Sequence, residues 1–380
     1  MSQARSYKTH APRAVTPRSM NLTRIALVLC LAPLAHADTA VTRERSITQL
    51  TDGVYMIRHP DAPDEFPQGN TTVVIGKQGV LVVDSTYLPS EARRDIAQIQ
   101  KWTRLPVKYL VNTHWHYDHT MGNGTYAAAF PAISVVAQRE TAAHIAGYNP
   151  GWFERYPGRR ADFEARAASG KDRDGKPLDA DTIATYKKAA AGTQKVEPEF
   201  KAIVDRVPDT TFDREMRVDL GGREVRLLHL GRGNTTGDAI VYLPKEKIVV
   251  AGDLLDHPVP YLGGGYPAEL VATLRAMGEL DFTTIVPGHG EVLRGAPARA
   301  YLALVIEFVD TVVQQVSKEI YRAGSGARNQ DAVRDAVLKS LDVAGWRKKF
   351  GGDDKDNAAM FDGFSLPGVI TAAFQDLNKR

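Results

Sequence analysis

Apolar positions in the first part of the chain recur in short runs that glycines separate, which is typical of β-strands joined by tight connections. The helical period of 3.6 appears between two of these runs, where Ile96, Ile99 and Trp102 fall on one face and Ser90 stands at the N-cap position. We therefore predict a helix over 90–102. The strands predicted in this half are 54–57, 71–75, 80–83, 107–111 and 133–136.

A second group of strands follows a segment of different character. Residues 145–205 are rich in charges and alanine, and we interpret them as a helical insertion that could cover a site. From 299 to 321 the apolar positions have a helical period, which predicts a long amphipathic helix. Two strand groups with helices between them favour sheets that are covered by helices on their outer sides. The strands predicted in this second half are 224–228, 239–243, 247–251 and 284–286.

The N-terminus has the pattern of a secretory signal peptide. Arg24 precedes an apolar run over 25–34, and the run ends in Ala35-His36-Ala37. A run of that length is too short to cross a bilayer, which takes about 20 residues. The alternative is a buried hydrophobic helix. We predict a signal peptide over 1–37 with Met20 as the better start, and a periplasmic or secreted product without a stable membrane anchor.

Removal of this segment changes the charge and the cysteine count. Residues 1–37 carry five basic side chains and no acidic ones, so the formal net charge falls from +3 to −2. The single cysteine, Cys30, is lost as well, which excludes a disulfide framework and a multi-cysteine zinc site. A slightly acidic chain without a basic aromatic stripe gives no argument for a nucleic-acid partner. We expect a small-molecule substrate.

Four potential metal ligands stand within six residues directly after a predicted strand. Alternation along an extended strand end places His114 and His116 on one side, and Asp118 and His119 turn toward the same space. Three imidazoles and one carboxylate suit a zinc-type ion. Solvated or core histidines are the alternative, and we favour the metal site.

Two later strand ends could complete the site. Asp253 follows the strand over 247–251 after a glycine, and His289 follows the strand over 284–286 in the sequence Pro-Gly-His-Gly. Each pattern alone is weak, because Gly-Asp and Gly-His also mark ordinary turns. In this order and together with the cluster at 114–119, the three segments are specific.

These residues resemble the metallo-β-lactamase superfamily of metal-dependent hydrolases. The likeness rests on H-x-H-x-D-H at 114–119, the Ala-Gly-Asp ending at Asp253, the Pro-Gly-His-Gly around His289, and the strand-end Asp84. It implies an α+β fold, a four-layer αββα sandwich with the metal site at one edge between the sheets. We assign the family domain to 45–295, the helical insertion to 145–205, and a helical C-terminal extension to 296–380.

The resemblance also implies a ligand set. One ion takes His114, His116 and a third histidine, whereas the other takes Asp118, His119 and His289 with Asp253 bridging, and Asp84 supports the ligands. In this chain Asn234 occupies the position of the third histidine. An amide oxygen is a poorer zinc ligand than imidazole, so one zinc ion per chain is favoured and a second is weak or absent. His229 is a possible substitute ligand.

This ligand set predicts a zinc-dependent hydrolase. A bound divalent metal lowers the pKa of water toward 7, and the hydroxide can attack an ester, lactone, thioester or lactam carbonyl. Asp118 is the candidate catalytic residue that orients the nucleophile or moves its proton. Two alternatives are a degenerate member that binds metal or ligand without turnover, and an iron redox protein, against which the missing histidine argues.

Other residues are weaker candidates for the walls of the site. An aromatic or imidazole ring near the cluster could line a pocket or simply pack, and we favour a wall position only for Tyr117. Arg232 could pair with a substrate carboxylate or lie exposed in a polar turn. The candidates for the pocket wall are Trp115, Tyr117, His257 and Tyr261.

Overall fold

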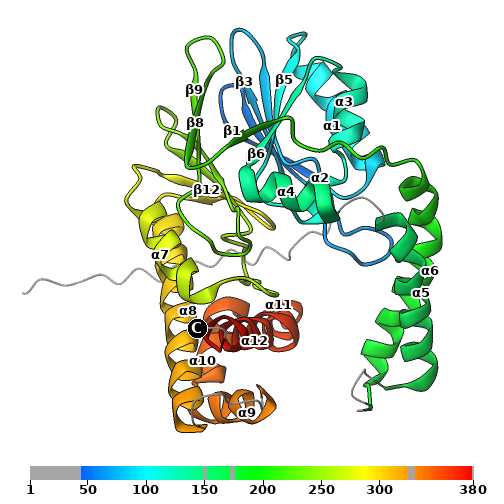
Figure 1. The fold of residues 1–380 in the computed structure, drawn as a ribbon, viewed down its shortest axis with the longest axis vertical. Coiled ribbons are helices and arrows are strands. Elements are labelled where there is room, and N and C mark those ends of the chain that lie inside the picture. Colours follow the sequence, from blue (N-terminus) through cyan, green and yellow to red (C-terminus); the bar gives the residue numbers. More distant parts are fainter. Residues whose placement is uncertain (1–43, 149–151, 172–174, 176, 324–329, 379–380) are drawn as a thin grey trace, which may run out of the picture. The chain divides into compact units, whose positions relative to one another are not determined.

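Two β-sheets face each other in the computed structural model, which describes residues 44–148, 152–171, 175, 177–323 and 330–378 (Figure 1). The predicted signal peptide over 1–37 lies outside these residues. The strands are β1 Ser46–Thr51, β2 Val54–Arg58, β3 Thr71–Ile75, β4 Val80–Val83, β5 Val107–Asn112, β6 Ser134–Gln138, β7 Thr210–Phe212, β8 Glu215–Asp219, β9 Glu224–Leu228, β10 Ile240–Leu243, β11 Ile248–Gly252, β12 Thr284–Pro287 and β13 Leu293–Arg294.

Helices surround the sheets and occupy the C-terminal part of the chain. No helix of the described residues has the length and apolar character that a membrane span requires. The helices are α1 Pro89–Trp102, α2 Tyr117–Thr120, α3 Asn123–Ala129, α4 Arg139–Tyr148, α5 Trp152–Ser169, α6 Ala180–Lys201, α7 Pro267–Gly278, α8 Ala296–Ala323, α9 Gln330–Ser340, α10 Val343–Gly351, α11 Lys355–Met360, the π-helical turn η1 Phe361–Ser365, and α12 Leu366–Leu377.

The strand order places parallel pairs where the candidate ligands are. The first sheet has the order β1-β2-β3-β4-β5-β6-β7 among the described residues, antiparallel up to β4 and parallel from β4 to β7. The second has the order β13-β12-β11-β10-β9-β8, in which β11 and β12 are parallel. The carboxyl ends of parallel strands meet at one edge, where loops can build a site.

Alternation along the strands of the first sheet separates two apolar layers. In β4, Val80 and Val82 pack with Ile96 and Ile99 of α1, whereas Leu81 and Val83 point to the opposite side, toward the second sheet. All four valine and leucine side chains are buried because both faces of the strand are covered. The helical layer that α1 and α3 form therefore lies on the outer face of this sheet.

The second sheet repeats the arrangement with the opposite outer layer. In β10, Val241 and Leu243 face the first sheet, whereas Ile240 and Tyr242 pack against helices α7, α8 and α12. The molecule thus has the predicted four layers in the order αββα, and the C-terminal helices form the outermost one. Burying each such apolar side chain contributes about 1.5–3 kcal/mol relative to exposure.

The insertion is anchored to the first half of the chain through the end of α6. Val196 and Phe200 pack with Tyr87 and Tyr117 in a separate apolar cluster. Our expectation that Ser90 caps α1 with its own side chain is wrong, because the helix begins at Pro89. The Ser90 backbone N–H and hydroxyl instead donate to the Glu199 carboxylate of α6, at 2.8 and 2.9 Å.

Candidate metal centre

The predicted ligands come together at the carboxyl ends of the two parallel strand pairs. Asp84 follows β4, and the segment 114–119 begins two residues after β5. In the second sheet Asp253 follows β11, and His289 comes two residues after β12. Residues that are up to 175 positions apart in the chain thus form one buried cluster, because both sheets present this edge to the same space.

One group within the cluster contains four close donors. The Nε2 atom of His119 lies 3.1 Å from Oδ1 of Asp253 and 3.2 Å from Nε2 of His289. His289 Nε2 lies 3.0 Å from Oδ2 of Asp118. We call Asp118, His119, Asp253 and His289 the complete group; one donor atom from each lies within 4.8 Å of every other.

A second group shares Asp253 and is less compact. His114 Nε2 lies 3.2 Å from Asp253 Oδ2, and His116 Nδ1 lies 4.0 Å from the same oxygen. The amide nitrogen of Asn234 lies 3.4 Å from His116 Nδ1 and 3.5 Å from Asp253 Oδ2. We call His114, His116 and Asp253 the partial group, since the next side chain is a neutral amide.

The donor chemistry fits a metal ion. Ligands about 2.0–2.1 Å from a tetrahedral zinc ion stand about 3.3 Å apart, which matches the separations in the complete group. His114 Nε2 and Asp253 Oδ1 are buried and have no hydrogen-bond partner in the described part of the chain. Buried polar atoms normally have a partner; a cation in the complete group would satisfy Asp253 Oδ1, and one in the partial group would satisfy His114 Nε2.

Asp84 fixes the first ligand segment, residues 114–119, through hydrogen bonds to Thr113 and His119. Its two carboxylate oxygens accept from the Thr113 backbone N–H and hydroxyl, each at 2.8 Å. Oδ2 also lies 2.9 Å from Nδ1 of His119, so this nitrogen donates and Nε2 is directed to the cluster. Asp84 has a φ of 59°, a left-handed conformation that non-glycine residues seldom adopt. Such a conformation is retained where surrounding contacts fix it.

Local packing also fixes the ligands of the second sheet. A Cβ atom at Gly288 would collide with Oδ1 of Asp253, so glycine is needed where His289 and Asp253 approach. The turn that carries Asn234 is held by Asp238, whose carboxylate accepts from the N–H groups of Gly233 and Thr235 at 2.9 and 2.8 Å. The turn therefore presents the Asn234 side chain to the partial group.

In the complete group, neighbouring charges lower the pKa of a carboxyl group and raise the pKa of an imidazole. Burial alone would raise the pKa of Asp118, but His119 and His289 lower it to about 2. Burial alone would lower the pKa of His289, yet Asp253 and Asp118 raise it to about 9. At neutral pH the metal-free group therefore holds protons on imidazole between ionised carboxylates, and a cation would replace those protons.

Among the wall candidates, Tyr117 differs from the position expected for it. Tyr117 is buried in the apolar cluster around Phe200, so the structure assigns it to packing. Trp115 is half-buried with its ring edge-on to His116 at 4.6 Å. Burial lowers the pKa of His257 to about 4. Tyr261 is 42% exposed, and burial followed by the Asp118 carboxylate raises its pKa.

Neither Arg232 nor His229 belongs to the donor cluster. The Arg232 guanidinium is engaged with the Glu269 carboxylate, with Nε at 2.8 Å from Oε2, and lies over the Tyr266 ring. The Arg232 side chain is 40% exposed beside the turn that carries Asn234, which agrees with the exposed position considered for it, and its carboxylate partner belongs to this chain. Nδ1 of His229 donates to the Asp238 backbone oxygen at 2.7 Å, and His229 is in neither donor group.

A backbone contact that the sequence pattern does not predict joins the two ligand segments. The Gly69 backbone N–H donates to the Asp118 carbonyl at 3.0 Å, and the Asn70 N–H donates to the Gly288 carbonyl at 2.7 Å. His59 accompanies them, with its ring 2.8 Å from the Gly69 carbonyl. The sequence contains one weak indication of the partner of His59. It is Asp95, an acidic residue next to the apolar face of the helix predicted over 90–102.

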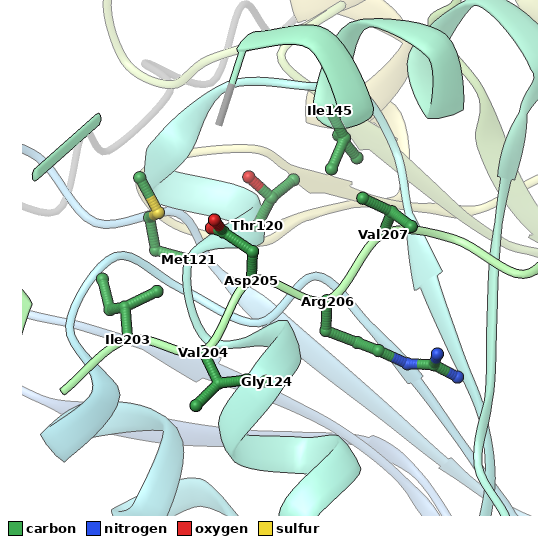
Figure 2. Close-up of a pocket in the computed structure, with 9 residues that line it drawn as sticks. All are labelled: Thr120, Met121, Gly124, Ile145, Ile203, Val204, Asp205, Arg206 and Val207. Atoms are coloured by element: carbon green, nitrogen blue, oxygen red, sulfur yellow. The ribbon is translucent and has the colours of Figure 1, made fainter. Parts of the chain in front are cut away.

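A small pocket lies apart from the donors, beside α2 and α3 (Figure 2). Its wall is the connection from α6 to β7, which approaches α3 so closely that a Cβ at Gly124 would collide with the Val204 carbonyl. None of the predicted site residues lines it. The lining residues are Thr120, Met121, Gly124, Ile145, Ile203, Val204, Asp205, Arg206 and Val207.

Comparisons with known proteins agree with this geometry. The family model of the metallo-beta-lactamase superfamily matches residues 64–289. Lactamase-like protein aptB of Emericella nidulans is 32% identical over 90 residues, which cover 23% of this chain and 29% of that protein. Metallo-beta-lactamase type 2 of Bacteroides fragilis is 29% identical over 91 residues, which cover 22% of this chain and 36% of that protein. The matches thus span about a third of these relatives.

Solved structures extend the likeness in fold. A metallo-beta-lactamase from Pontibacter korlensis is 17% identical to this chain and superposes with a TM-score of 0.50. The superposition covers 70% of this chain and 99% of that chain. At this identity the likeness concerns the fold alone.

Proposed function

Because this chain belongs to the metallo-beta-lactamase superfamily, we propose that it is a zinc-dependent hydrolase that opens an ester, lactone, thioester or lactam bond. The observation that carries this proposal is the gathering of two imidazoles and two carboxylates in the complete group, with donor separations of 3.0–3.7 Å. Such a set suits an ion that takes nitrogen and oxygen ligands.

One zinc ion per chain is the favoured stoichiometry. Asp118, His119, Asp253 and His289 would hold it, whereas His114 and His116 would hold a second ion weakly or not at all. Asn234 stands beside the partial group, and a neutral amide is a weaker ligand than imidazole. Asp84 supports the site by fixing the tautomer of His119, as partners of metal-binding histidines do.

The residues of the complete group have distinct tasks in hydrolysis. With zinc held by these residues, the chemistry supplied would be an acidified water as nucleophile and a polarised substrate carbonyl. In the metal-free protein His119 and His289 lower the pKa of Asp118 to about 2 against the effect of burial, and a bound cation would likewise keep this carboxylate ionised. The Asp118 carboxylate can orient the nucleophile and accept a proton, which it then passes to the leaving group.

A metal-binding protein without turnover is the second candidate. The observation that favours it is the amide of Asn234, 3.4 Å from His116 at the position where the resemblance implies a third histidine. Such a protein would hold zinc in the complete group and bind a ligand without cleaving it. The two candidates differ only in turnover, so an activity measurement separates them.

We also propose that the chain is exported, with residues 1–37 removed and the mature protein in the periplasm or outside the cell. The support is the basic start, the short apolar run and the Ala-x-Ala ending in the sequence. Sequencing the N-terminus of the protein from the producing cell should give Asp38 as the first residue. An unprocessed N-terminus would contradict the proposal.

The hydrolase proposal is tested with the purified protein on a panel of ester, lactone, thioester and lactam substrates. We expect turnover of at least one class in the zinc-loaded protein, its loss after chelation, and its return with zinc. Asp118→Ala should abolish turnover. Absence of turnover on every class by a protein that contains zinc would overturn the proposal and favour the second candidate.

A further inference from the structure

A buried histidine and aspartate lie behind the complete group and are absent from its ligand set. His59 Nε2 is 3.0 and 3.1 Å from the two carboxylate oxygens of Asp95, and both side chains are fully buried. Its Nδ1 is 2.8 Å from the Gly69 carbonyl oxygen. Each ring nitrogen faces acceptor oxygens, and these contacts on both sides fix the ring in one orientation.

Asp95 anchors this histidine to α1. The Asp95 carboxylate also accepts from Nη1 of Arg45 at 2.7 Å. Burial alone would raise the pKa of Asp95, but His59 and Arg45 lower it below its usual value, so the carboxylate stays charged. A buried charged acceptor with two charged or polar donors forms hydrogen bonds stronger than neutral ones.

His59 thereby fixes a short segment that contacts ligands from both sheets. We call Gly69 and Asn70 the clasp. The clasp donates from the Gly69 N–H to the Asp118 carbonyl and from the Asn70 N–H to the Gly288 carbonyl. The Asn70 amide nitrogen also donates to the carbonyls of Pro287 and Gly290, each at 3.0 Å, on both sides of His289.

The clasp also touches a ligand ring directly. A Cβ atom at Gly69 would collide with the imidazole of His119, so the glycine backbone lies against that ring. A displacement of the clasp would therefore move the His119 ring and the backbone on both sides of His289 together. These two residues supply the imidazole nitrogens of the complete group, which lie 3.2 Å apart.

We propose that His59 is a positioning residue for the metal centre, which acts by holding the Gly69 carbonyl and with it the clasp that sets His119 against His289. The proposal rests on the proposed function in so far as the complete group binds zinc. Asp95 holds His59, and its role is one step further from the ligands.

Two substitutions of one residue separate the two hydrogen bonds of His59. Asparagine places its amide nitrogen where Nδ1 lies, so His59→Asn keeps the donor to Gly69 and loses the one to Asp95. Glutamine places its amide nitrogen where Nε2 lies, so His59→Gln keeps the donor to Asp95 and loses the one to Gly69. Both remove the same ring from the core, but His59→Asn loses the stronger, charge-assisted bond and is expected to be the less stable variant, so weaker zinc binding confined to His59→Gln would not reflect folding stability.

The first readout is the zinc dissociation constant of the full-length protein, measured by competition with a chromogenic chelator. We expect His59→Gln to weaken zinc binding about tenfold and His59→Asn to stay within about threefold of the wild type, as expected for a partner that orients ligands. Val312→Ala, in the buried face of α8, is the control that lowers stability without touching the clasp. It should leave the zinc dissociation constant unchanged.

The second readout needs no zinc. Hydrogen exchange of the Gly69 and Asn70 amides in the metal-free protein should become faster in His59→Gln and stay slow in His59→Asn. Equal zinc affinities and equal exchange in the two variants would overturn the proposal. If the wild type binds no zinc, the proposed function fails, and the exchange measurement alone then decides whether His59 fixes the clasp.

Discussion

The complete and partial groups share Asp253 yet differ in what surrounds their other ligands. In the complete group, His119 is held through Nδ1 by Asp84, and His289 lies between backbone carbonyls that Asn70 binds. In the partial group, His116 has 30% of its side chain exposed and faces the amide of Asn234. The two groups thus differ in the hydrogen bonds that fix their side chains as well as in the number of candidate ligands.

This comparison predicts that the two donor groups at one edge of the sandwich would bind metal with unequal strength. The shared carboxylate places both positions within one cluster, so distance alone does not rank them. The relative zinc affinity of the two groups follows from the charge of their donors and from the side chains and backbone groups that fix those donors. An ordered ligand loses less conformational freedom when a metal binds. We therefore expect zinc to occupy the complete group first.

The largest effect is expected when the shared ligand is removed. Asp253→Asn should weaken zinc binding more than about 100-fold, beyond the cost of losing a supporting partner, and should abolish any turnover. Competition with a chelator gives the affinity. Binding that stays within a few fold of the wild type would show that the two groups do not depend on a common carboxylate.

Restoring the third imidazole should remove the inequality between the groups. Asn234→His adds a nitrogen donor beside His116, and we expect a second zinc ion per chain. Metal analysis after gel filtration measures the ratio of zinc to protein. A ratio that stays at one would mean that the position of His114 and His116, and not the amide, limits the partial group.

The support of the complete group can be weakened without touching its ligands. Asp84→Asn keeps the shape of the side chain but removes the charge that Thr113 and His119 share. We expect zinc affinity to fall about 10–100-fold. The measurement is the zinc dissociation constant, with Asp335→Asn on the exposed side of α9 as the matched control. An unchanged constant would contradict the role of Asp84.

Much of this site was predictable from the sequence, because each ligand follows a strand with a clear apolar period and the spacing of the motifs is characteristic. The four-layer fold was predictable for the same reason. The clasp was not, since Gly69 and Asn70 act through backbone groups that any sequence carries. Its partners also come from distant segments, as Glu199 does for Ser90. Tyr117 was misplaced because an aromatic ring serves equally well in a wall or a core.

The pH dependence of zinc binding should follow the histidines of the complete group. The pKa of His289 in the metal-free protein is about 9, raised by Asp253 and Asp118 against burial, so zinc displaces a proton below that pH. We expect affinity to rise about tenfold per pH unit from 6.5 to 9 for each proton displaced. Titration calorimetry in buffers of different ionisation enthalpy counts the protons. No proton release would contradict the assignment.

The same shift predicts how the metal-free protein responds to pH. The folded-state pKa of His289 lies above its ordinary value of 6.5, so its stabilising contribution is present below pH 6.5 and is lost as pH rises through 9. Thermal unfolding of the metal-free protein should therefore move to lower temperature over this range. The zinc-bound protein should not show this loss.

The smallest effect concerns the contact between the insertion and α1. Glu199→Gln retains the size of the side chain and weakens its acceptance of the Ser90 N–H and hydroxyl. We expect a loss of about 0.5–2 kcal/mol in the free energy of unfolding, the usual cost of losing a helix N-terminal cap. Zinc affinity should not change. Weaker zinc binding in this variant would extend the support of the metal centre to α6.

We expect the complete group to hold one metal ion, and the decisive experiment is metal analysis of the purified wild-type protein. After dialysis against metal-free buffer, the account predicts one zinc ion per chain, retained by Asp118, His119, Asp253 and His289. His289→Ala should then lose that ion. Two ions held with equal strength, or none, would contradict the account.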